Sequence, residues 1–433
     1  MTTKSNEIDL EIVELLPSGE GVARSNSKPI QVRNALPGES VRARILKKRK
    51  GVKYSDAIEI RKASNNRKES PCQYFPRCGG CSMLHMTQTA ELEVKQNKLL
   101  FDLNENSIVF EKVSEPIAKN ILGYRRKARL GVKCLGDTVL VGFRESFSSR
   151  VARIDSCEIL TYKLSSLIKG LKKVISQCSI KNHIPQIELA EGDDGVALIV
   201  RHLEDFSDSD ILLWRDFSVE TNSSVFFQSS GYDSMTLLDA QSSSSELSYA
   251  LTDHGLNLKF YPEQFIQINA EMNVELISTA LCFFGDLEGK TIQDFFSGIG
   301  NFSLPMARRG AQVFGYELSN DSVDMAIQNA VDNELEQRTE FASVDLYRDL
   351  PTLKQSPDGI LIDPPRSGAG DHLSRWLEAA TCKQVVYVSC NSESFSRDAK
   401  TIVELGFKAK QIVLLNMFPG TSHFETVSLF VRD

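Results

Sequence analysis

The stretch "TIQDFFSGIGNFSLPMARRG", residues 291–310, decides the fold of the C-terminal part of the chain. It reads as a strand, a Gly-x-Gly turn at Gly298 and Gly300, and a helix. The glycines let the backbone turn tightly beside a ligand, and the N-terminus of the helix favours an anionic group. "AQVFGYELSND" follows as a second strand that ends at Glu317, about 20 residues beyond the turn, where an acid can accept hydrogen bonds from ribose hydroxyls. This order predicts a nucleotide-type cofactor site.

The glycine turn lacks one feature of dinucleotide-binding loops, and this indicates the class of cofactor. Asn301 and Phe302 come directly after Gly300, so the third glycine of a dinucleotide fingerprint is missing. This disfavours NAD and favours a cofactor without a pyrophosphate, S-adenosylmethionine (AdoMet). Asp345 ends the next strand-like piece and either contacts the adenine or faces solvent. Strands and helices alternate from about Glu271 to the C-terminus, which predicts a doubly wound sheet.

Two more segments place polar residues directly after apolar strands. "DGILIDPPRSGAG" (358–370) ends in Asp363-Pro-Pro-Arg366, and its prolines make the backbone rigid beyond the sheet. An aromatic residue often follows this element in methyltransferases that act on amino groups, so Arg366 makes an amino-group target less favourable. "VVYVSCNSESFSRD" (385–398) puts Cys390 at the junction of a strand and a helix. From this position alone, Cys390 is either a reactive thiol or a small apolar residue that ends the strand.

The charge of the chain is unevenly distributed. The 433 residues carry a net charge of −7, but residues 1–70 carry +6 and the remainder −13. Short strand patterns separated by turn signals fill the first sixty residues, which predicts a small barrel of the OB type, a common nucleic-acid platform. A basic surface on such a barrel suits phosphate binding, although basic runs are also often solvated faces.

A cysteine-rich segment follows the predicted barrel. "PCQYFPRCGGCSMLH" has the spacing Cys72-x5-Cys78-x2-Cys81, which predicts a metal site once a fourth ligand is added. The spacing alone leaves zinc and a [4Fe–4S] cluster open. A helix is expected near 89–104, and β structure over 121–260, including a hairpin in "QIELAEGDDGVALIVRHL".

Five C-terminal motifs, taken in order, are similar to those of the RNA uracil-5-methyltransferase family. They are "FIQINA" (265–270), "DFFSGIGNFSLP", "LIDPPRSGAG", "YVSCN" and "MFPGTSHFETV". The resemblance implies a multidomain α/β and β protein with an OB-like TRAM RNA-binding barrel (1–63), a central α+β iron–sulfur domain (64–259) and a Rossmann-like AdoMet-dependent methyltransferase domain (260–433). The full-length architecture resembles members that methylate one uridine of 23S ribosomal RNA, naked or in an early assembly intermediate.

The resemblance also assigns residues to roles. It implies that Cys390 is the nucleophile and Glu425 the base, and that Cys157 joins the cysteine triplet around a [4Fe–4S] cluster. The residues that it places in the AdoMet site are Gln267, Phe296, Asn301, Glu317, Asp345 and Asp363. Arg366 is a candidate for steadying an enolate oxygen, and His423 is either a proton shuttle or a packed side chain.

The chemistry of uracil explains why these residue types are needed. Uracil C5 is too weak a nucleophile to take a methyl group from a sulfonium directly. A thiolate that adds to C6 makes C5 nucleophilic, and a base then removes the C5 proton so that the thiolate can leave. The target base must first be flipped out of its stack.

Other readings stay open. A tRNA methyltransferase of the same family, a radical-AdoMet methylthiotransferase with a TRAM domain, and a non-catalytic RNA-binding protein are the alternatives. The Cys-x5-Cys spacing and the Gly-x-Gly loop argue against the radical enzyme, and Cys390 together with Glu425 argues against a binding protein. Without a signal-peptide pattern or a membrane span in the sequence, we expect a cytoplasmic monomer.

Overall fold

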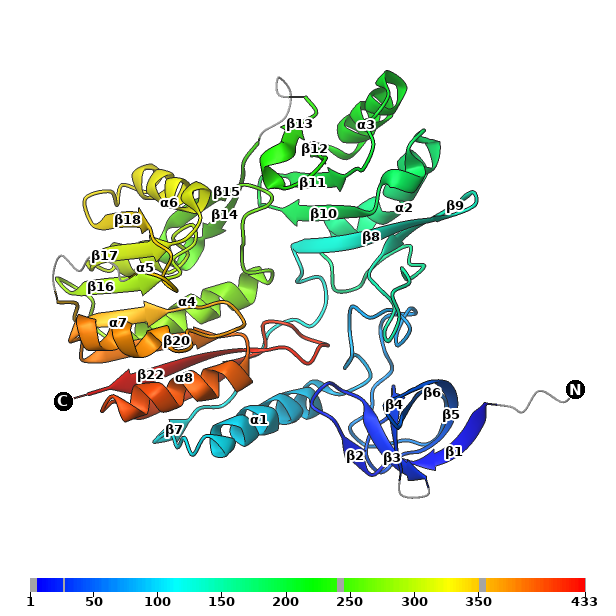
Figure 1. Cartoon of the computed structure of the whole chain (residues 1–433), viewed down its shortest axis with the longest axis horizontal. Helices are drawn as coiled ribbons and strands as arrows, with labels where there is room; N and C mark the ends of the chain where they lie inside the picture. Colours follow the sequence, from blue (N-terminus) through cyan, green and yellow to red (C-terminus); the bar gives the residue numbers. More distant parts are fainter. Residues whose placement is uncertain (1–5, 26–27, 240–244, 350–355, 433) are drawn as a thin grey trace, which may run out of the picture.

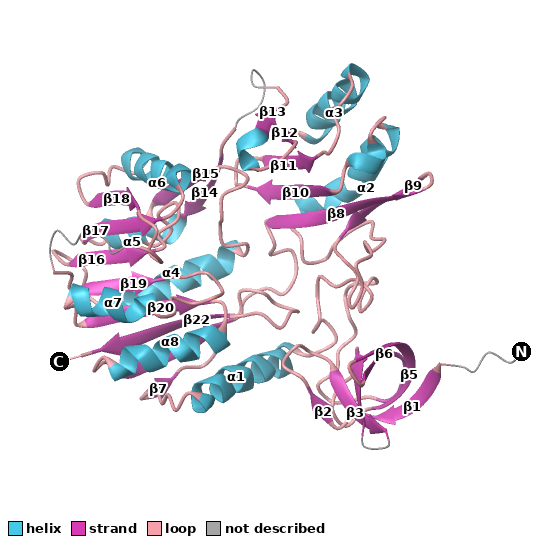
Figure 2. Cartoon of the chain, in the orientation of Figure 1, coloured by secondary structure: helices cyan, strands magenta, loops and turns pink. Residues whose placement is uncertain are grey.

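The structure is a computed structural model that describes residues 6–25, 28–239, 245–349 and 356–432. Figure 1 shows three groups of elements: a small β lobe, a central sheet with its helices, and a large sheet flanked by helices. The same arrangement, coloured by type of element, is seen in Figure 2. Among the described residues, every helix is too short or too polar to cross a membrane.

The N-terminal lobe is one curled sheet with the strand order β1-β5-β6-β4-β3-β2. Alternate apolar residues such as Ile30, Val32 and Val41 are buried inside the curl, as the period of two in the sequence predicts. Register shifts in the long β5–β6 pair bend it around this core. The strands are β1 (Glu7–Glu11), β2 (Glu14–Leu15), β3 (Gly21–Ser25), β4 (Lys28–Arg33), β5 (Ser40–Arg49) and β6 (Val52–Lys62).

The central sheet has the order β13-β12-β11-β10-β8-β9 and packs against two helices. The predicted hairpin is confirmed, since β10 and β11 pair antiparallel from Gln186↔Arg201 to Glu191↔Val196. The elements are β8 (Lys127–Leu135), β9 (Thr138–Gly142), α2 (Tyr162–Gln177), η1 (Lys181–His183), β10 (Gln186–Glu191), β11 (Val196–Arg201), α3 (Asp208–Thr221), β12 (Ser223–Gln228), η2 (Tyr232–Ser234) and β13 (Met235–Leu237).

The prediction of a central iron–sulfur domain is wrong. Cys72, Cys78, Cys81 and Cys157 line one small pocket with a volume of about 20 Å³. A metal site, however, requires several donor atoms that converge at coordination distance. Across the ranges that the structure describes, no group of three or more His, Cys, Asp or Glu residues could hold a metal ion. The region is therefore an α+β domain in which four thiols share a pocket, and the [4Fe–4S] cluster that the family resemblance implied is withdrawn.

The C-terminal sheet has eight strands in the order β18-β17-β16-β19-β20-β22-β21-β7. β18 to β20 are parallel, whereas β22 inserts antiparallel between β20 and β21. The strands are β16 (Thr291–Phe295), β17 (Gln312–Glu317), β18 (Thr339–Ser343), β19 (Gly359–Ile362), β20 (Gln384–Ser389), β21 (Lys408–Leu415) and β22 (Glu425–Val431), with a separate hairpin of β14 (Leu247–Leu251) and β15 (Leu256–Phe260) joined by η3 (Thr252–His254). The helices are α4 (Ala270–Phe284), α5 (Ser303–Arg308), α6 (Asn320–Asp332), α7 (His372–Ala380) and α8 (Ser392–Glu404).

Two elements from earlier in the chain pack on this sheet. β7 (Lys112–Val113) pairs parallel with the edge strand β21. Helix α1 (Gln88–Glu105) lies along α8 and contributes Leu99 and Leu103 to the same core. The helix begins one residue before the predicted start, because the Thr87 side chain caps its N-terminus. Residues 88–113 thus lie with the C-terminal sheet, outside the range 260–433 that the sequence suggests for the methyltransferase domain.

Candidate active site

The glycine loop lies at the carboxyl ends of β16 and β17, where doubly wound sheets bind their ligands. Phe296, Gly298 and Gly300 have φ angles of 66°, 54° and 93°, so the backbone turns sharply back toward the sheet. The N–H of Gly298 donates to Glu317 at 3.2 Å. The other carboxylate oxygen of Glu317 accepts from the backbone N–H groups of Leu318 and Ser319, at 2.8 and 3.0 Å. The loop and the predicted ribose acid are thus held together.

Beneath the loop lies a buried carboxyl group that the sequence did not single out. Asp294 has no exposed surface and accepts a hydrogen bond from the hydroxyl of Ser303. Burial, together with the carboxylates of Asp363 and Glu317, raises the pKa of Asp294 to about 7, while the hydrogen bond from Ser303 opposes this shift. Asp294 Oδ1 and Ser297 Oγ are buried without a hydrogen-bond partner among the described groups. A cofactor that brings an ammonium group and hydroxyls, as AdoMet does, fits these unsatisfied atoms.

The other residues predicted to line the AdoMet site surround this loop to different degrees. Phe296 packs on Tyr347 and Trp376 with centroid distances of 5.6 and 5.8 Å. The Asn301 amide bonds to Tyr249 and Asn273, so it anchors the loop to α4.

Gln267 and Asp345 are held by local contacts. Gln267 is buried, and its backbone carbonyl accepts from Arg126 at 2.9 Å. Asp345 accepts from the N–H of Tyr347 at 3.1 Å and pairs with Arg348 at 3.3 Å. Gln267 lies three residues before α4, and Asp345 lies two residues after β18.

Cys390 and Glu425 are neighbours across two antiparallel strands. β20 and β22 pair with Ser389 opposite Thr426, so Cys390 directly follows one member of this pair and Glu425 directly precedes the other. Asp363 directly follows β19, the next strand along, and its N–H donates to the Phe295 carbonyl at 3.2 Å. The sheet thus brings together a thiol, two carboxyl groups and the glycine loop.

Burial at this edge of the sheet favours the protonated forms of Cys390, Asp363 and Glu425. Burial, together with the Glu425 and Asp363 carboxylates, raises the pKa of Cys390 to about 12. Burial also raises the pKa of Asp363 to about 7 and that of Glu425 well above its usual range. In the free protein, the thiol therefore holds its proton near neutral pH, and burial shifts the Glu425 carboxyl toward its protonated form.

Arg366 is the cation that opposes these shifts. Its guanidinium contacts the Cys390 thiol and lowers the pKa of both Cys390 and Glu425. One of its nitrogens lies 3.4 Å from Nδ1 of His423. The Arg366 carbonyl accepts hydrogen bonds from Asn391 and Ser394, each at 3.0 Å, which fixes the Pro-Pro-Arg turn against the start of α8.

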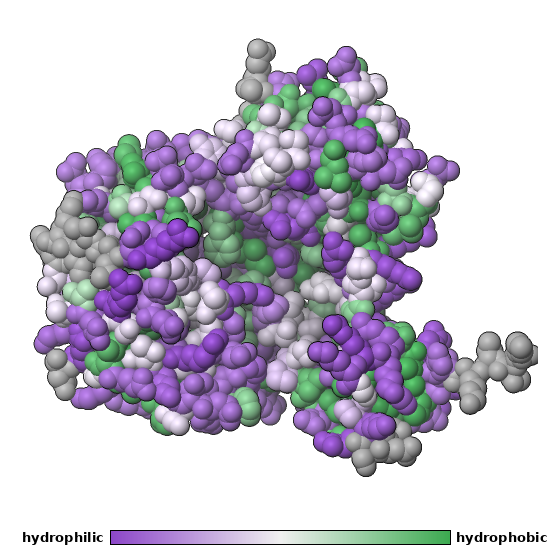
Figure 3. All heavy atoms as spheres, viewed as in Figure 1, coloured by the Kyte–Doolittle hydropathy of each residue, from purple (hydrophilic) through white to green (hydrophobic). Residues whose placement is uncertain are grey.

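A surface pocket opens in front of Cys390. It is walled by segments from four parts of the chain: Leu16, Pro17 and Ser18; Lys98 of α1; Cys390, Asn391 and Ser392; and Ser422, His423 and Phe424. The space-filling view in Figure 3 shows the large hollow between the lobes. The N-terminal lobe thus contributes a wall to the pocket of the candidate nucleophile.

The fold and the site define the chain as a member of the class of AdoMet-dependent methyltransferases. A structure of the Pyrococcus abyssi tRNA (uracil-54, C5)-methyltransferase in complex with S-adenosyl-L-homocysteine superposes with a TM-score of 0.74 over 98% of this chain and 100% of that chain, at 24% identity. This similarity shows a common fold.

The family follows from the sequence comparisons. The profile of the tRNA (Uracil-5-)-methyltransferase family matches residues 88–433, so the match begins at the first residue of α1. The 23S rRNA (uracil(1939)-C(5))-methyltransferase RlmD of Hahella chejuensis is 37% identical over 98% of this chain and 97% of its own length. The RlmD protein of Thiobacillus denitrificans is 37% identical over 98% of this chain and 99% of its own. The chain belongs to the uracil-5-methyltransferase family.

Proposed function

We propose that this protein transfers the methyl group of AdoMet to C5 of a uridine in 23S ribosomal RNA. The observation that carries the proposal is the position of Cys390 beside Glu425 across β20 and β22, with Arg366 in contact with the thiol. A nucleophile and a base on neighbouring strands suit a reaction in which one group adds to a ring and the other removes a proton from the adjacent carbon.

Cys390 performs the first step in this proposal. The thiol loses its proton to solvent through the open pocket, and its sulfur forms a bond with C6 of the flipped uracil. Arg366 favours this step, because its positive charge lowers the pKa of Cys390 and can also neutralise the enolate oxygen. The ring electrons are then available at C5. AdoMet supplies a methyl group on a positively charged sulfur, and the new C5–CH₃ bond forms as the sulfur–methyl bond breaks.

Glu425 completes the cycle. Its carboxylate takes the C5 proton, the C5–C6 double bond returns, and the C6–sulfur bond breaks to release the Cys390 thiolate. Burial favours the protonated form of Glu425, so only the ionised form of this carboxyl can act as the base. Arg366 lowers the pKa of both Glu425 and Cys390, so this one cation favours the ionised form that each group needs for its step.

We assign the AdoMet site to the glycine loop and the strand ends beside it. Glu317 would accept from the ribose hydroxyls, Phe296 and Asp345 would face the adenine, and Gln267, Asn301 and Asp363 would complete the pocket. Two buried atoms without partners, Asp294 Oδ1 and Ser297 Oγ, support this assignment.

The RNA class follows from the relatives and from the N-terminal lobe. The relatives with the same overall length are named as 23S rRNA methyltransferases. Lys47 of β5 lies 5.5 Å above the Tyr54 ring and 5.2 Å from that of Phe147, beside Arg49 in the same groove. A cation next to aromatic rings suits phosphates and unstacked bases. We propose that residues 1–63 form an RNA-binding domain and that a monomer acts on RNA that is naked or in early assembly.

Nucleoside analysis of RNA from a strain without this gene tests the proposal. Expression of the wild type should restore one 5-methyluridine in 23S rRNA, and Cys390→Ala should not. Cys282→Ala is the matched control, since Cys282 is an exposed cysteine on α4 away from the pocket. Restoration of 5-methyluridine in tRNA alone would favour the tRNA alternative, and activity of Cys390→Ala would exclude the covalent mechanism.

A further inference from the structure

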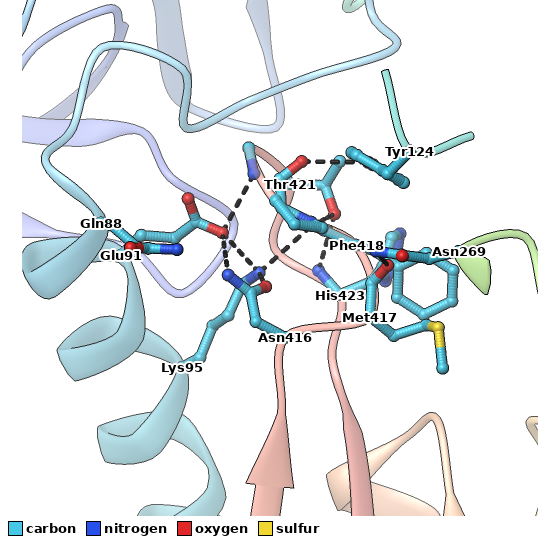
Figure 4. A network of polar contacts seen from close by, with 12 residues as sticks. Gln88, Glu91, Lys95, Tyr124, Asn269, Asn416, Met417, Phe418, Thr421 and His423 are labelled. Atoms are coloured by element: carbon cyan, nitrogen blue, oxygen red, sulfur yellow. Dashed lines mark hydrogen bonds and ion pairs between the residues drawn. The ribbon is translucent and has the colours of Figure 1, made fainter. Parts of the chain in front are cut away.

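Helix α1 holds the loop that precedes Glu425 through a buried ion pair. Glu91 and Lys95 lie 2.7 Å apart, one turn from each other, with side chains about 2% and 1% exposed. Figure 4 shows both side chains pointing away from the helix toward the loop between β21 and β22. Lys95 donates to Asn416 Oδ1 at 2.6 Å and to the Phe418 carbonyl at 3.2 Å. Glu91 accepts from the N–H of Gly420 at 3.0 Å.

These contacts continue along the loop to His423. The Phe418 carbonyl that accepts from Lys95 also accepts from the hydroxyl of Thr421 at 2.8 Å. The oxygen of that hydroxyl in turn accepts from the N–H of His423 at 3.2 Å. His423 contacts Arg366, which contacts Cys390. An unbroken series of polar contacts therefore joins the ion pair to the surroundings of the thiol.

The same helix also holds the element that follows the nucleophile. Asp102 accepts from the hydroxyl of Ser392 at 2.5 Å, two residues after Cys390. Asn106, the C-cap of α1, donates to Ser396 at 2.9 Å. The segment after Cys390 and the loop before Glu425 are thus both attached to one rigid helix.

We propose that α1 is a clamp that fixes the nucleophile and the base relative to each other, with Glu91 and Lys95 as positioning residues. This inference rests on the proposed function, because it assigns the clamp to the reaction of Cys390 and Glu425. Among the described residues, no hydrogen bond or ion pair joins α1 to the glycine loop or to Glu317, so we expect the clamp to act on the methyl transfer and not on cofactor binding.

The polarity of the pair supports a role in positioning. Both side chains lose their hydration on burial, and replacing a buried ion pair by apolar residues of similar size is often neutral or stabilising. Apolar residues at 91 and 95 could fill the same space. They could not bond to the Gly420 N–H, the Asn416 amide and the Phe418 carbonyl, which set the path of the loop.

The main test replaces the pair by Glu91→Leu with Lys95→Met, which removes the polar contacts without leaving a buried charge. The variant should unfold cooperatively and bind AdoMet within about twofold of wild type. KM for RNA should change by less than about threefold, whereas kcat should fall by about 100-fold, the scale of a small misplacement of reacting groups. Formation of the covalent adduct with 5-fluorouridine RNA should slow by the same factor. Lys400→Met with Glu404→Leu is the matched control, because this exposed pair of α8 has the same spacing.

Two variants of Thr421 test the same proposal if the Glu91→Leu, Lys95→Met variant does not fold. Thr421→Val keeps the shape but loses the hydroxyl between Phe418 and His423, so kcat should fall at constant KM. Thr421→Ser keeps the hydroxyl and should recover most of the rate. Equal kcat values for Thr421→Val and Thr421→Ser would contradict the proposed clamp. Parallel losses in kcat and AdoMet affinity would also contradict it. If wild type itself forms no 5-methyluridine, the proposed function fails instead, which separates the two outcomes.

Discussion

The carboxylate of Asp294 is bridged to the hydroxyl of Ser303 across the glycine loop, from the end of β16 to the first turn of α5. This contact ties the two sides of the turn together beneath the cofactor site. It also buries a titratable group whose pKa lies near neutrality, so the stability of the loop should respond to pH.

Stability should fall as pH rises because of Asp294. Its pKa is raised from 3.8 to about 7 in the folded protein, so the folded state binds its proton more tightly than the unfolded chain. Its contribution is complete below about pH 4 and is lost as pH rises to about 7, by up to about 1.4 kcal/mol per pH unit. Denaturant unfolding at pH 4.5 to 8 should therefore show a shallower pH dependence for Asp294→Asn.

A control of opposite sign lies on α6. The Lys259 side chain lowers the pKa of Asp332, so this group stabilises the protein at higher pH and loses its effect as pH falls. Asp332→Asn should therefore lessen the loss of stability below about pH 4 and leave the slope between about pH 4.5 and 8 at its wild-type value. Identical slopes for wild type and Asp294→Asn would contradict a raised pKa at Asp294.

Glu425→Gln should trap the enzyme on its RNA. The amide has the same shape but cannot take the C5 proton, so Cys390 adds and the methyl group transfers while release is blocked. A slow-migrating band on a denaturing gel is the expected result. The band should require AdoMet and disappear in Cys390→Ala, Glu425→Gln. Normal turnover of Glu425→Gln would mean that another group is the base, with His423 the nearest candidate.

Arg366→Gln should make Cys390 less reactive toward alkylating agents. Removal of the guanidinium raises the pKa of the thiol further, so less thiolate is present at pH 9. Iodoacetamide labelling of this cysteine, followed by mass spectrometry of its peptide, should slow severalfold. Arg375→Gln, an exposed arginine on α7, should label at the wild-type rate. An unchanged rate in Arg366→Gln would show that the arginine does not tune the thiol.

Charge reversal on the N-terminal lobe should weaken RNA binding and lower its dependence on salt. Lys47→Glu with Arg49→Glu removes two cations from the groove beside Tyr54, and each lost phosphate contact lowers the slope of log K against log salt by about 0.7 for single strands. AdoMet affinity, measured by calorimetry, should stay constant. Lys169→Glu with Lys173→Glu makes the same charge change on exposed residues of α2. Equal effects of the two changes would indicate general attraction and no RNA site on this lobe.

Local patterns predicted the parts of the fold that depend on neighbouring residues. Gly298 and Gly300 are separated by one residue because a tight turn must join β16 to α5, and the hairpin of β10 and β11 follows from its Asp-Asp-Gly turn. These features need only backbone sterics and a periodic pattern, so they can be read from a short window.

Contacts between distant segments could not be predicted in this way. Cys390 and Glu425 meet because β22 inserts antiparallel next to β20, a register that neither segment encodes alone. The spacing of Glu91 and Lys95 is the i, i+4 spacing of many exposed helix pairs, and only the loop that packs over them makes this pair buried. The cysteine spacing misled for the same reason, since separation along the chain does not fix the distances between thiols in the fold.

The place of α1 against α8 has a consequence for how the protein is made. About 290 residues separate the end of α1 from the start of α8. A ribosome that adds about 5–20 residues per second needs about 15–60 s to make this stretch. During that time Leu99 and Leu103 have no α8 to cover them, and Lys95 has no Asn416. The nascent helix must therefore wait, with its apolar face uncovered, until the last part of the chain has emerged.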